Sequence, residues 1–188
     1  MSFITAEDFE ARYRSDPDPW GYLVSEYERR KYAATLAACG PGPFACALEL
    51  GGSIGVFSAM LAPRCERLVT VDVAPTAVAR ARSRLAEHTA ADPIVGAIPA
   101  AVPRLPFDLV VASEILYYLS DEELVGTLSL LQRCMVAGAR LVAVHWRPRG
   151  PERPRDAQQA HAALARAPWL TRVQRGGTDD YLLEVFRR

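Results

Sequence analysis

The stretch "LELGGSIGVF", residues 48–57, decides the fold, because an apolar run leads into a glycine-rich turn and then into a helical pattern. The run "FACALEL" over 44–50 predicts a buried strand, and "VFSAMLAPR" after the turn predicts a helix. Glycines let the backbone of such a turn pass close to a ligand, and the free N–H groups of the helix start favour anionic groups. A nucleotide site and a tight turn that binds nothing both fit this pattern, so a second feature must decide.

Length and charge limit the classes of protein that the chain can belong to. Its 188 residues are enough for one domain with its own core, and 50% hydrophobic with 23% charged residues is a globular balance. Basic and acidic residues are equal at 22 each, which disfavours nucleic-acid and membrane partners. No run approaches the roughly 18 apolar residues that span a bilayer, and the acidic start does not resemble a signal peptide. We therefore expect a cytoplasmic protein.

The cysteines carry no metal-binding or disulfide pattern. Cys39, Cys46, Cys65 and Cys134 are scattered, without a C-x-x-C pair or a histidine at metal-ligand spacing. Such residues act as small buried hydrophobes in a reducing compartment. We expect four free thiols and no metal site.

Short apolar runs and longer helical patterns alternate along the rest of the chain. The runs over 67–73, 93–99, 107–115 and 138–146 predict strands, and the patterns over 75–88, 120–135 and 157–167 predict helices. Ser120 with Glu123 three residues later predicts a capping box. Strands and helices that alternate at this spacing predict parallel βαβ units with right-handed crossovers.

Both ends of the chain depart from this alternation. Gly176 and Gly177 in "RGGTDD" predict the turn of a terminal hairpin. We expect a Rossmann-like, doubly wound, mostly parallel seven-stranded sheet with an antiparallel C-terminal hairpin strand. Residues 1–40 form a predicted helical lid on the α/β core of 41–188, within a single domain 1–188. The candidate lid residues, which suit a hydrophobic latch equally well, are Trp20, Tyr22, Tyr27, Glu28 and Lys31.

An acid downstream of the glycine turn indicates a nucleoside ligand. Asp72 ends the predicted strand 67–73 and lies 72 − 51 = 21 residues after Gly51. Ligands of open parallel sheets bind beyond the carboxyl ends of the strands, where a carboxylate at this spacing suits the two hydroxyls of a ribose. Ser53 and Val56 stand where the dinucleotide fingerprint G-x-G-x-x-G has glycines, which disfavours a nicotinamide oxidoreductase.

The same residues resemble the motifs of class I S-adenosylmethionine-dependent methyltransferases. "LELGGSIG" resembles the first motif, E-x-G-x-G-x-G, with Ser53 in place of the middle glycine. "VDVAPTAVARAR" resembles the second motif, with Asp72 as the ribose acid, and "FDLVVASEILYYLSDEEL" resembles the fourth. More narrowly, "DPWGYLVSEYERRKYAATLAA", the S-I-G of the turn, "SEILYYL" and "VAVHWR" resemble the NodS group, whose members N-methylate the glucosamine of nodulation chitooligosaccharides.

The resemblance implies S-adenosyl-L-methionine as cofactor and S-adenosyl-L-homocysteine as product. The implied cofactor-binding residues are Trp20, Glu49, Gly51, Gly52, Ser53, Gly55, Asp72, Val73, Ala97, Ile98 and Ser113. Many members also have an acid after the third strand that contacts the adenine, but "VGAIPAAVP" has none. We expect adenine contacts from the backbone of this loop and from Val73 and Ile98.

The methyl acceptor is expected at the carboxyl ends of the last two parallel strands. An amine attacks only when neutral, so a carboxylate or a histidine can orient it and take its proton. Glu114 and His145 are the candidate catalytic residues; a surface acid is the alternative for Glu114, whose strand-end position favours a functional role, and a structural histidine is the alternative for His145. Tyr117, Tyr118 and Trp146 are candidate walls of the acceptor cleft, and His88 and His161 are expected at the surface or near helix ends.

The sequence thus predicts a methyltransferase of specialised metabolism, including natural product biosynthesis. N-methylation of an amino sugar or related amine is the leading hypothesis, with a sugar or a glycosylated metabolite as the small-molecule partner. A sugar O-methyltransferase and a catalytically silent cofactor-binding module are the alternatives. The sequence leaves the acceptor and the oligomeric state open.

Overall fold

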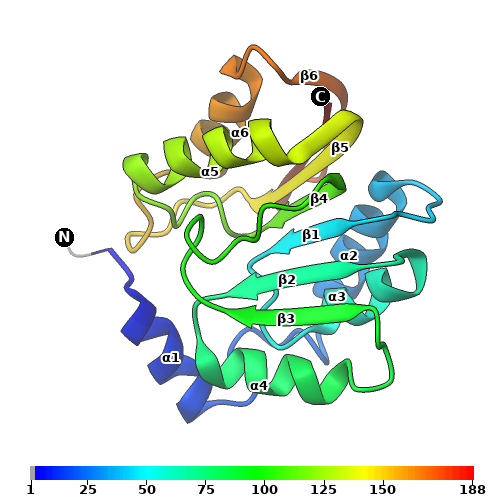
Figure 1. The fold of residues 1–188 in the computed structure, drawn as a ribbon. Coiled ribbons are helices and arrows are strands. Elements are labelled where there is room, and N and C mark those ends of the chain that lie inside the picture. Colours follow the sequence, from blue (N-terminus) through cyan, green and yellow to red (C-terminus); the bar gives the residue numbers. More distant parts are fainter. Residues whose placement is uncertain (1–2) are drawn as a thin grey trace.

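A computed structural model describes residues 3–188, so the first two residues of the predicted N-terminal lid lie outside it. The described residues form one seven-stranded sheet in the order β3-β2-β1-β4-β5-β7-β6 (Figure 1). The strands are β1 Ala47–Leu50, β2 Leu68–Asp72, β3 Ala91–Val95, β4 Phe107–Ser113, β5 Met135–Trp146, β6 Thr171–Gly177 and β7 Tyr181–Arg187. The helices are α1 Ala6–Ser15, α2 Glu26–Cys39, α3 Val56–Leu61, the 3₁₀ turn η1 Ala62–Arg64, α4 Pro75–Arg84, α5 Asp121–Cys134 and α6 Ala157–Arg166.

The strand directions confirm the predicted Rossmann-like sheet. β1 to β5 pair in parallel, and β7 runs antiparallel between β5 and β6. The position of the hairpin turn was predicted wrongly, because Gly176 and Gly177 lie inside β6 and the turn follows them. A Cβ on Gly177 would lie 2.2 Å from the carbonyl oxygen of Tyr181, so glycine here permits the close approach of the two strands.

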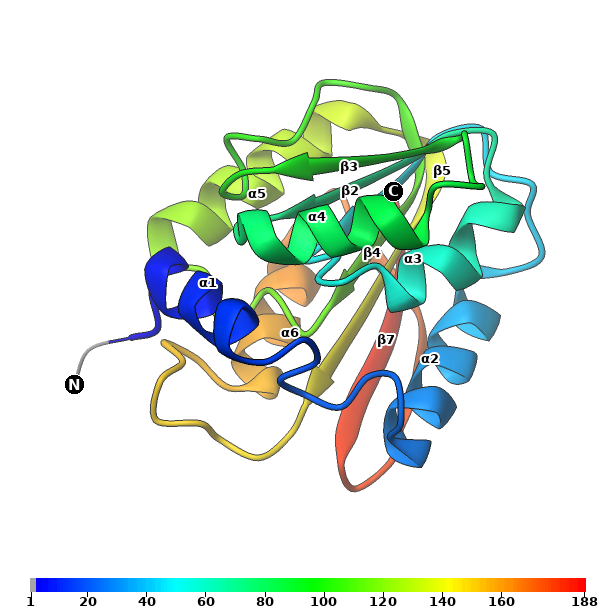
Figure 2. The same ribbon diagram turned by 90° about the horizontal axis from the view of Figure 1, so that it is seen from below.

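The core has two layers, one on each face of the sheet. In β4, Val110 and Ala112 face one layer while Leu109 and Val111 face the other. α5 and α6 cover the first layer, and α2 and α3 cover the second (Figure 2). Because both faces are covered, the central strands are apolar at nearly every position.

The predicted N-terminal lid divides into two parts. α2 packs against the sheet face beside α3 and β5, whereas α1 lies at the carboxyl ends of the parallel strands (Figure 1). Hydrogen bonds join α1 to α4: the Thr76 N–H and hydroxyl donate to Glu10 at 2.9 and 2.5 Å, and Arg80 donates to the Tyr13 carbonyl at 2.7 Å. The chain changes direction between β1 and β4, so α1 covers the crevice where such sheets bind ligands.

The local predictions are confirmed in kind, and the bounds of several elements differ by a few residues. Ser120 and Glu123 form the predicted capping box of α5, and all four cysteines are free thiols. The strand predicted over 93–99 ends at Val95, because Gly96 turns the backbone with φ of +155°. In the described part of the chain, no helix is long and apolar enough to cross a membrane.

Candidate active site

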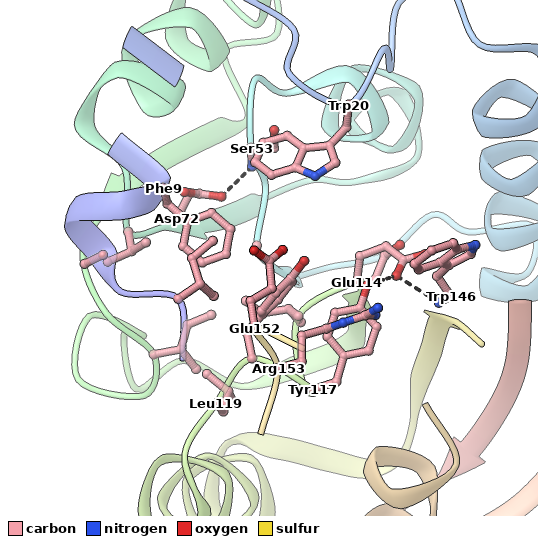
Figure 3. A pocket seen from close by; sticks show the side chains of 18 of the residues that line it. Phe9, Trp20, Ser53, Asp72, Glu114, Tyr117, Leu119, Trp146, Glu152 and Arg153 are labelled. Carbon is pink, nitrogen blue, oxygen red and sulfur yellow. Dashed lines mark hydrogen bonds between the residues drawn. The ribbon is translucent and has the colours of Figure 1, made fainter. Parts of the chain in front are cut away.

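A cavity of about 510 Å³ lies at the carboxyl edge of the sheet (Figure 3). Its walls come from α1, α2, the segment between these two helices, and the loops that follow β1, β2, β3, β4 and β5. The predicted cofactor residues that line it are Trp20, Gly51, Ser53, Asp72, Val73, Ala97, Ile98 and Ser113. Three others, Glu49, Gly52 and Gly55, lie behind this lining.

The Asp72 carboxylate is oriented by backbone groups at the edge of the cavity. The Ser53 N–H donates to Oδ2 at 2.8 Å, and the Ala74 N–H donates to Oδ1 at 3.0 Å. Burial raises the pKa of Asp72, and the backbone hydrogen bonds oppose that rise. Each oxygen keeps a further lone pair, so the carboxylate can accept hydrogen bonds from two neighbouring hydroxyl groups.

The glycine turn packs against neighbouring elements and also exposes its backbone to the cavity. Gly51 and Ser53 have φ of 77° and 51°, in the left-handed region that glycine adopts most readily. The Ser53 hydroxyl forms a hydrogen bond with the Tyr13 hydroxyl of α1. A Cβ on Gly52 would lie 1.7 Å from Thr70 Oγ1, and one on Gly55 would lie 3.0 Å from Ala81. Gly52 and Gly55 therefore let the turn pack on β2 and α4.

Glu49 supports the turn from the protein side. Its side chain is buried and accepts a hydrogen bond from the Ser58 hydroxyl of α3. Burial raises the pKa of Glu49 to about 7. The acid therefore ties the end of β1 to α3 and does not reach the cavity.

An aromatic wall from the N-terminal segment covers the Asp72 side of the cavity. The Trp20 ring lies 5.2 Å from the ring of Tyr13 and 6.0 Å from that of Tyr22. All five candidate lid residues line the cavity: Trp20, Tyr22, Tyr27, Glu28 and Lys31. Trp20 and Tyr22 also pack against a small core that includes Ile54 and Ala77, so the segment is both wall and latch. Sequence reasoning missed Phe9 and Tyr13, although their i, i+4 spacing on a helix signals one shared face.

Glu114 is the centre of a polar cluster on the opposite side of the cavity. It follows β4 with φ of 57°, and its carboxylate accepts hydrogen bonds from Lys31 at 2.7 Å and from the Trp146 N–H at 2.9 Å. The Tyr117 hydroxyl donates to the same carboxylate. We call Lys31, Glu114, Tyr117 and Trp146 the Glu114 cluster; all four line the cavity. Its acid is fixed in place and partly open to a ligand.

Lys31 holds two acids at once. Its side chain is only 2% exposed, and its ammonium lies 3.0 Å from Glu28 as well as 2.7 Å from Glu114. Burial raises the pKa of Glu28, and the charge of Lys31 opposes that rise. The cation thus connects α2 to the end of β4.

His145 lies behind the cavity and not in its lining. Its ring is fully buried, and Nε2 accepts the Leu116 N–H at 3.1 Å. Nδ1 must then carry the proton that it shares with His161 Nε2 at 3.0 Å, and His161 Nδ1 donates to Glu184 at 3.0 Å. Burial lowers the pKa of His145, which keeps the ring neutral. This placement corrects the expected direct contact with substrate: His145 positions the loop after Glu114.

The expectation that His161 lies at the surface is wrong. His161 is 2% exposed, because it lies on the face of α6 that packs against β5 and β7. Glu184 is also 2% exposed, and it pairs in addition with Arg172 at 3.0 Å. The hydrogen bonds satisfy these buried polar groups, which is what burial of such groups requires.

The loop between β5 and α6 contributes residues that sequence reasoning missed. Glu152 pairs with Arg12 of α1 at 2.6 Å, and its carbonyl accepts the Ile4 N–H at 3.1 Å. The Arg153 guanidinium lies 4.3 Å from the ring centre of Tyr117 and 5.2 Å from that of Trp146. No periodicity marks the direction of a loop side chain, so only the fold reveals these contacts.

The strand order, the glycine turn and the strand-end acid at one cavity define a class I S-adenosylmethionine-dependent methyltransferase fold. The particular family follows from a match of residues 6–145 to the family described as Nodulation protein S (NodS). The chain belongs to the NodS family.

Solved structures agree with this assignment. The crystal structure of the N-methyltransferase NodS from Bradyrhizobium japonicum WM9, in complex with S-adenosyl-L-homocysteine, has a TM-score of 0.88 at 28% identity. That similarity covers 98% of this chain and 99% of the other. A putative methyltransferase from Pseudomonas syringae is 35% identical with a TM-score of 0.76, over 87% of this chain and 100% of the other.

Curated relatives extend the assignment by sequence. Nodulation protein S of Sinorhizobium fredii is 37% identical over 111 residues, which are 58% of this chain and 51% of that protein. Nodulation protein S of Rhizobium tropici is 36% identical over 127 residues, which are 66% of this chain and 53% of that protein. The chain spans about half the length of these curated relatives.

Proposed function

We propose that the protein transfers a methyl group from S-adenosyl-L-methionine to the nitrogen of a small-molecule amine and releases S-adenosyl-L-homocysteine. The observation that carries this proposal is the fixed carboxylate of Glu114, which faces the same cavity as Asp72. One end of the cavity is thus built for a nucleoside and the other for a group that donates hydrogen bonds.

The residues of the Asp72 side fit the cofactor. Asp72 would accept the ribose hydroxyls, and the backbone of Gly51 and Ser53 is open to a ligand beside it. Val73, Ala97 and Ile98 offer an apolar lining for the adenine, in place of the missing acid. The bound cofactor supplies an electrophilic methyl group on its sulfonium. The S-adenosyl-L-homocysteine in the similar NodS structure supports this assignment.

Glu114 is proposed to orient the acceptor amine and to take its proton. Lys31 and the Trp146 N–H hold the carboxylate in one orientation, which positions a general base as catalysis requires. His145 acts through Leu116 as a positioning residue. The aromatic wall of the N-terminal segment is proposed to exclude water from the site when the ligands are bound.

The acceptor is proposed to be an amino sugar or a related amine of specialised metabolism. The resemblance to the NodS group, whose members N-methylate a glucosamine, supports this class of substrate, and the match to the NodS family agrees with that resemblance. The aromatic rings of Tyr117 and Trp146 are suited to the apolar face of a sugar ring, and both line the cavity.

The experiment measures release of S-adenosyl-L-homocysteine with glucosamine and with a deacetylated chitooligosaccharide. We expect Glu114→Gln to lower turnover by about 100-fold or more, the usual contribution of a general base, with unchanged affinity for S-adenosyl-L-homocysteine. Glu122→Gln, an exposed acid on α5 outside the cavity, is the matched control. Mass spectrometry of the product identifies the methylated atom. A methylated oxygen would favour a sugar O-methyltransferase, and cofactor binding without turnover would favour a silent module.

A further inference from the structure

Arg153 is a buried cation at the wall of the cavity. Its side chain is 5% exposed, and its guanidinium lies over the rings of Tyr117 and Trp146 at 4.3 and 5.2 Å. Figure 3 shows it beside Tyr117, on the same side of the pocket as Glu114. Nη2 donates to the carbonyl oxygen of Pro148 at 2.7 Å. The aromatic rings and this carbonyl hold the guanidinium in a defined place.

The charge of Arg153 has no counterion among residues 3–188. The neighbouring Glu152 pairs with Arg12 at 2.6 Å, and Glu114 pairs with Lys31 at 2.7 Å. Nη1 is buried and has no hydrogen-bond partner in the described part of the chain. A buried charge without a partner is costly, so its place in the lining of a cavity indicates that a ligand supplies the anion.

The loop is shaped to bring Arg153 to this position. A Cβ on Gly150 would lie 2.6 Å from Nε and 2.7 Å from Nη2 of Arg153. A side chain at position 150 would therefore force the Arg153 guanidinium to move from the place it occupies in this structure. Arg149, in the same loop, is exposed and does not line the cavity.

We propose that Arg153 forms an anion subsite beside the amine site, and that the methyl acceptor is an amine with a carboxylate or phosphate group close to it. The identity of the amine site rests on the proposed function. Both sites lie against one residue, since Glu114 meets the hydroxyl of Tyr117 and Arg153 meets its ring. An acceptor that reaches both therefore carries its amine and its anion on one scaffold about the size of a single sugar.

The test compares three amines by calorimetry in the presence of S-adenosyl-L-homocysteine: glucosamine, glucosamine 6-phosphate and muramic acid. They share the 2-amine and differ in the anionic group. We expect the better of the two anionic amines to bind about 10- to 100-fold more tightly than glucosamine, the usual contribution of a charged hydrogen bond. Tighter binding of muramic acid assigns a carboxylate, and tighter binding of glucosamine 6-phosphate assigns a phosphate.

Substitutions test whether the preference for anionic amines over glucosamine depends on Arg153. Arg153→Gln is expected to abolish it, Arg153→Lys to retain part of it, and the control Arg149→Gln to leave it unchanged. Equal binding of all three amines to the unaltered protein overturns the proposal, as does a preference whose size is undiminished in the Arg153 variants. Arg153→Lys keeps the positive charge against the two rings, so it serves as the test if Arg153→Gln does not fold.

Release of S-adenosyl-L-homocysteine, measured separately, distinguishes this proposal from the proposed function. Arg153-dependent binding of an anionic amine without any methyl transfer contradicts the proposed function alone. Methyl transfer to amines without a preference for the anionic ones contradicts the anion subsite alone. Failure of all three amines to bind contradicts both.

Discussion

Replacing Lys31 by methionine (K31M) removes the cation that connects α2 to the Glu114 cluster. Methionine fills a similar volume, so the principal change is loss of a charge that is 2% exposed and lies 3.0 Å from Glu28 and 2.7 Å from Glu114. Both acids are then left near each other in a partly buried site. We expect the folded state to lose stability.

Removal of one partner from a buried ion pair costs about 3–5 kcal/mol. We expect a cost at the lower end of this range, because Glu28 can become neutral by binding a proton. Burial already raises the pKa of Glu28 above its ordinary value in the folded state. The folded state therefore binds this proton more tightly than the unfolded chain, and the stability that proton binding contributes is lost as pH rises. We expect K31M to lose about 3 kcal/mol at pH 7.5 and less at pH 5.5.

Urea unfolding followed by circular dichroism measures this loss at both pH values. The double variant E28Q/K31M replaces the unpaired acid Glu28 by an amide. We expect its free energy of unfolding to be about 1 to 2 kcal/mol higher than that of K31M at pH 7.5. A loss below about 0.5 kcal/mol in K31M, the range of ordinary surface substitutions, would refute the buried ion pair. Equal stability of the single and double variants would refute the role of Glu28.

Three further predictions concern Asp72, His145 and Glu49. Asp72→Ala is expected to weaken binding of S-adenosyl-L-homocysteine by at least tenfold in calorimetry, because two charged hydrogen bonds are lost; unchanged affinity would remove the ribose role. In His145→Gln, the side-chain amide oxygen can accept the Leu116 N–H in place of Nε2, so we expect turnover within about tenfold of the unaltered protein. Turnover of His145→Ala is expected to be lower than that of His145→Gln. A loss of about 100-fold or more in both variants would show that His145 acts directly as the base. Burial raises the pKa of Glu49 to about 7, so the folded state binds this proton more tightly than the unfolded chain, and the free energy of unfolding in urea should fall as pH rises from 5 to 8. Glu49→Gln should make this pH dependence weaker. An unchanged pH dependence in Glu49→Gln would contradict the role of Glu49.

Local patterns were enough to predict most of the sheet. The alternation of apolar runs and helical stripes predicts the parallel strands, because a strand covered on both faces must be apolar along its length. The hairpin turn was misplaced, because glycine marks both a turn and a close approach of strands, and Gly177 serves the second purpose. The Asp72 side of the cavity follows from spacing alone, since a glycine turn and the next strand end meet at one edge of a parallel sheet.

The sequence by itself determined the fold class, the NodS resemblance and the Asp72 side of the cavity, because these depend on motifs that are each made of residues close together in the chain. Only the tertiary structure decided the Glu114 side of the cavity. It placed Glu114 against Lys31 from a helix 83 residues earlier, turned His145 away from the cavity, and brought Arg153 onto Tyr117. Such contacts join segments far apart in the chain, and the direction of a loop side chain depends on what packs around it.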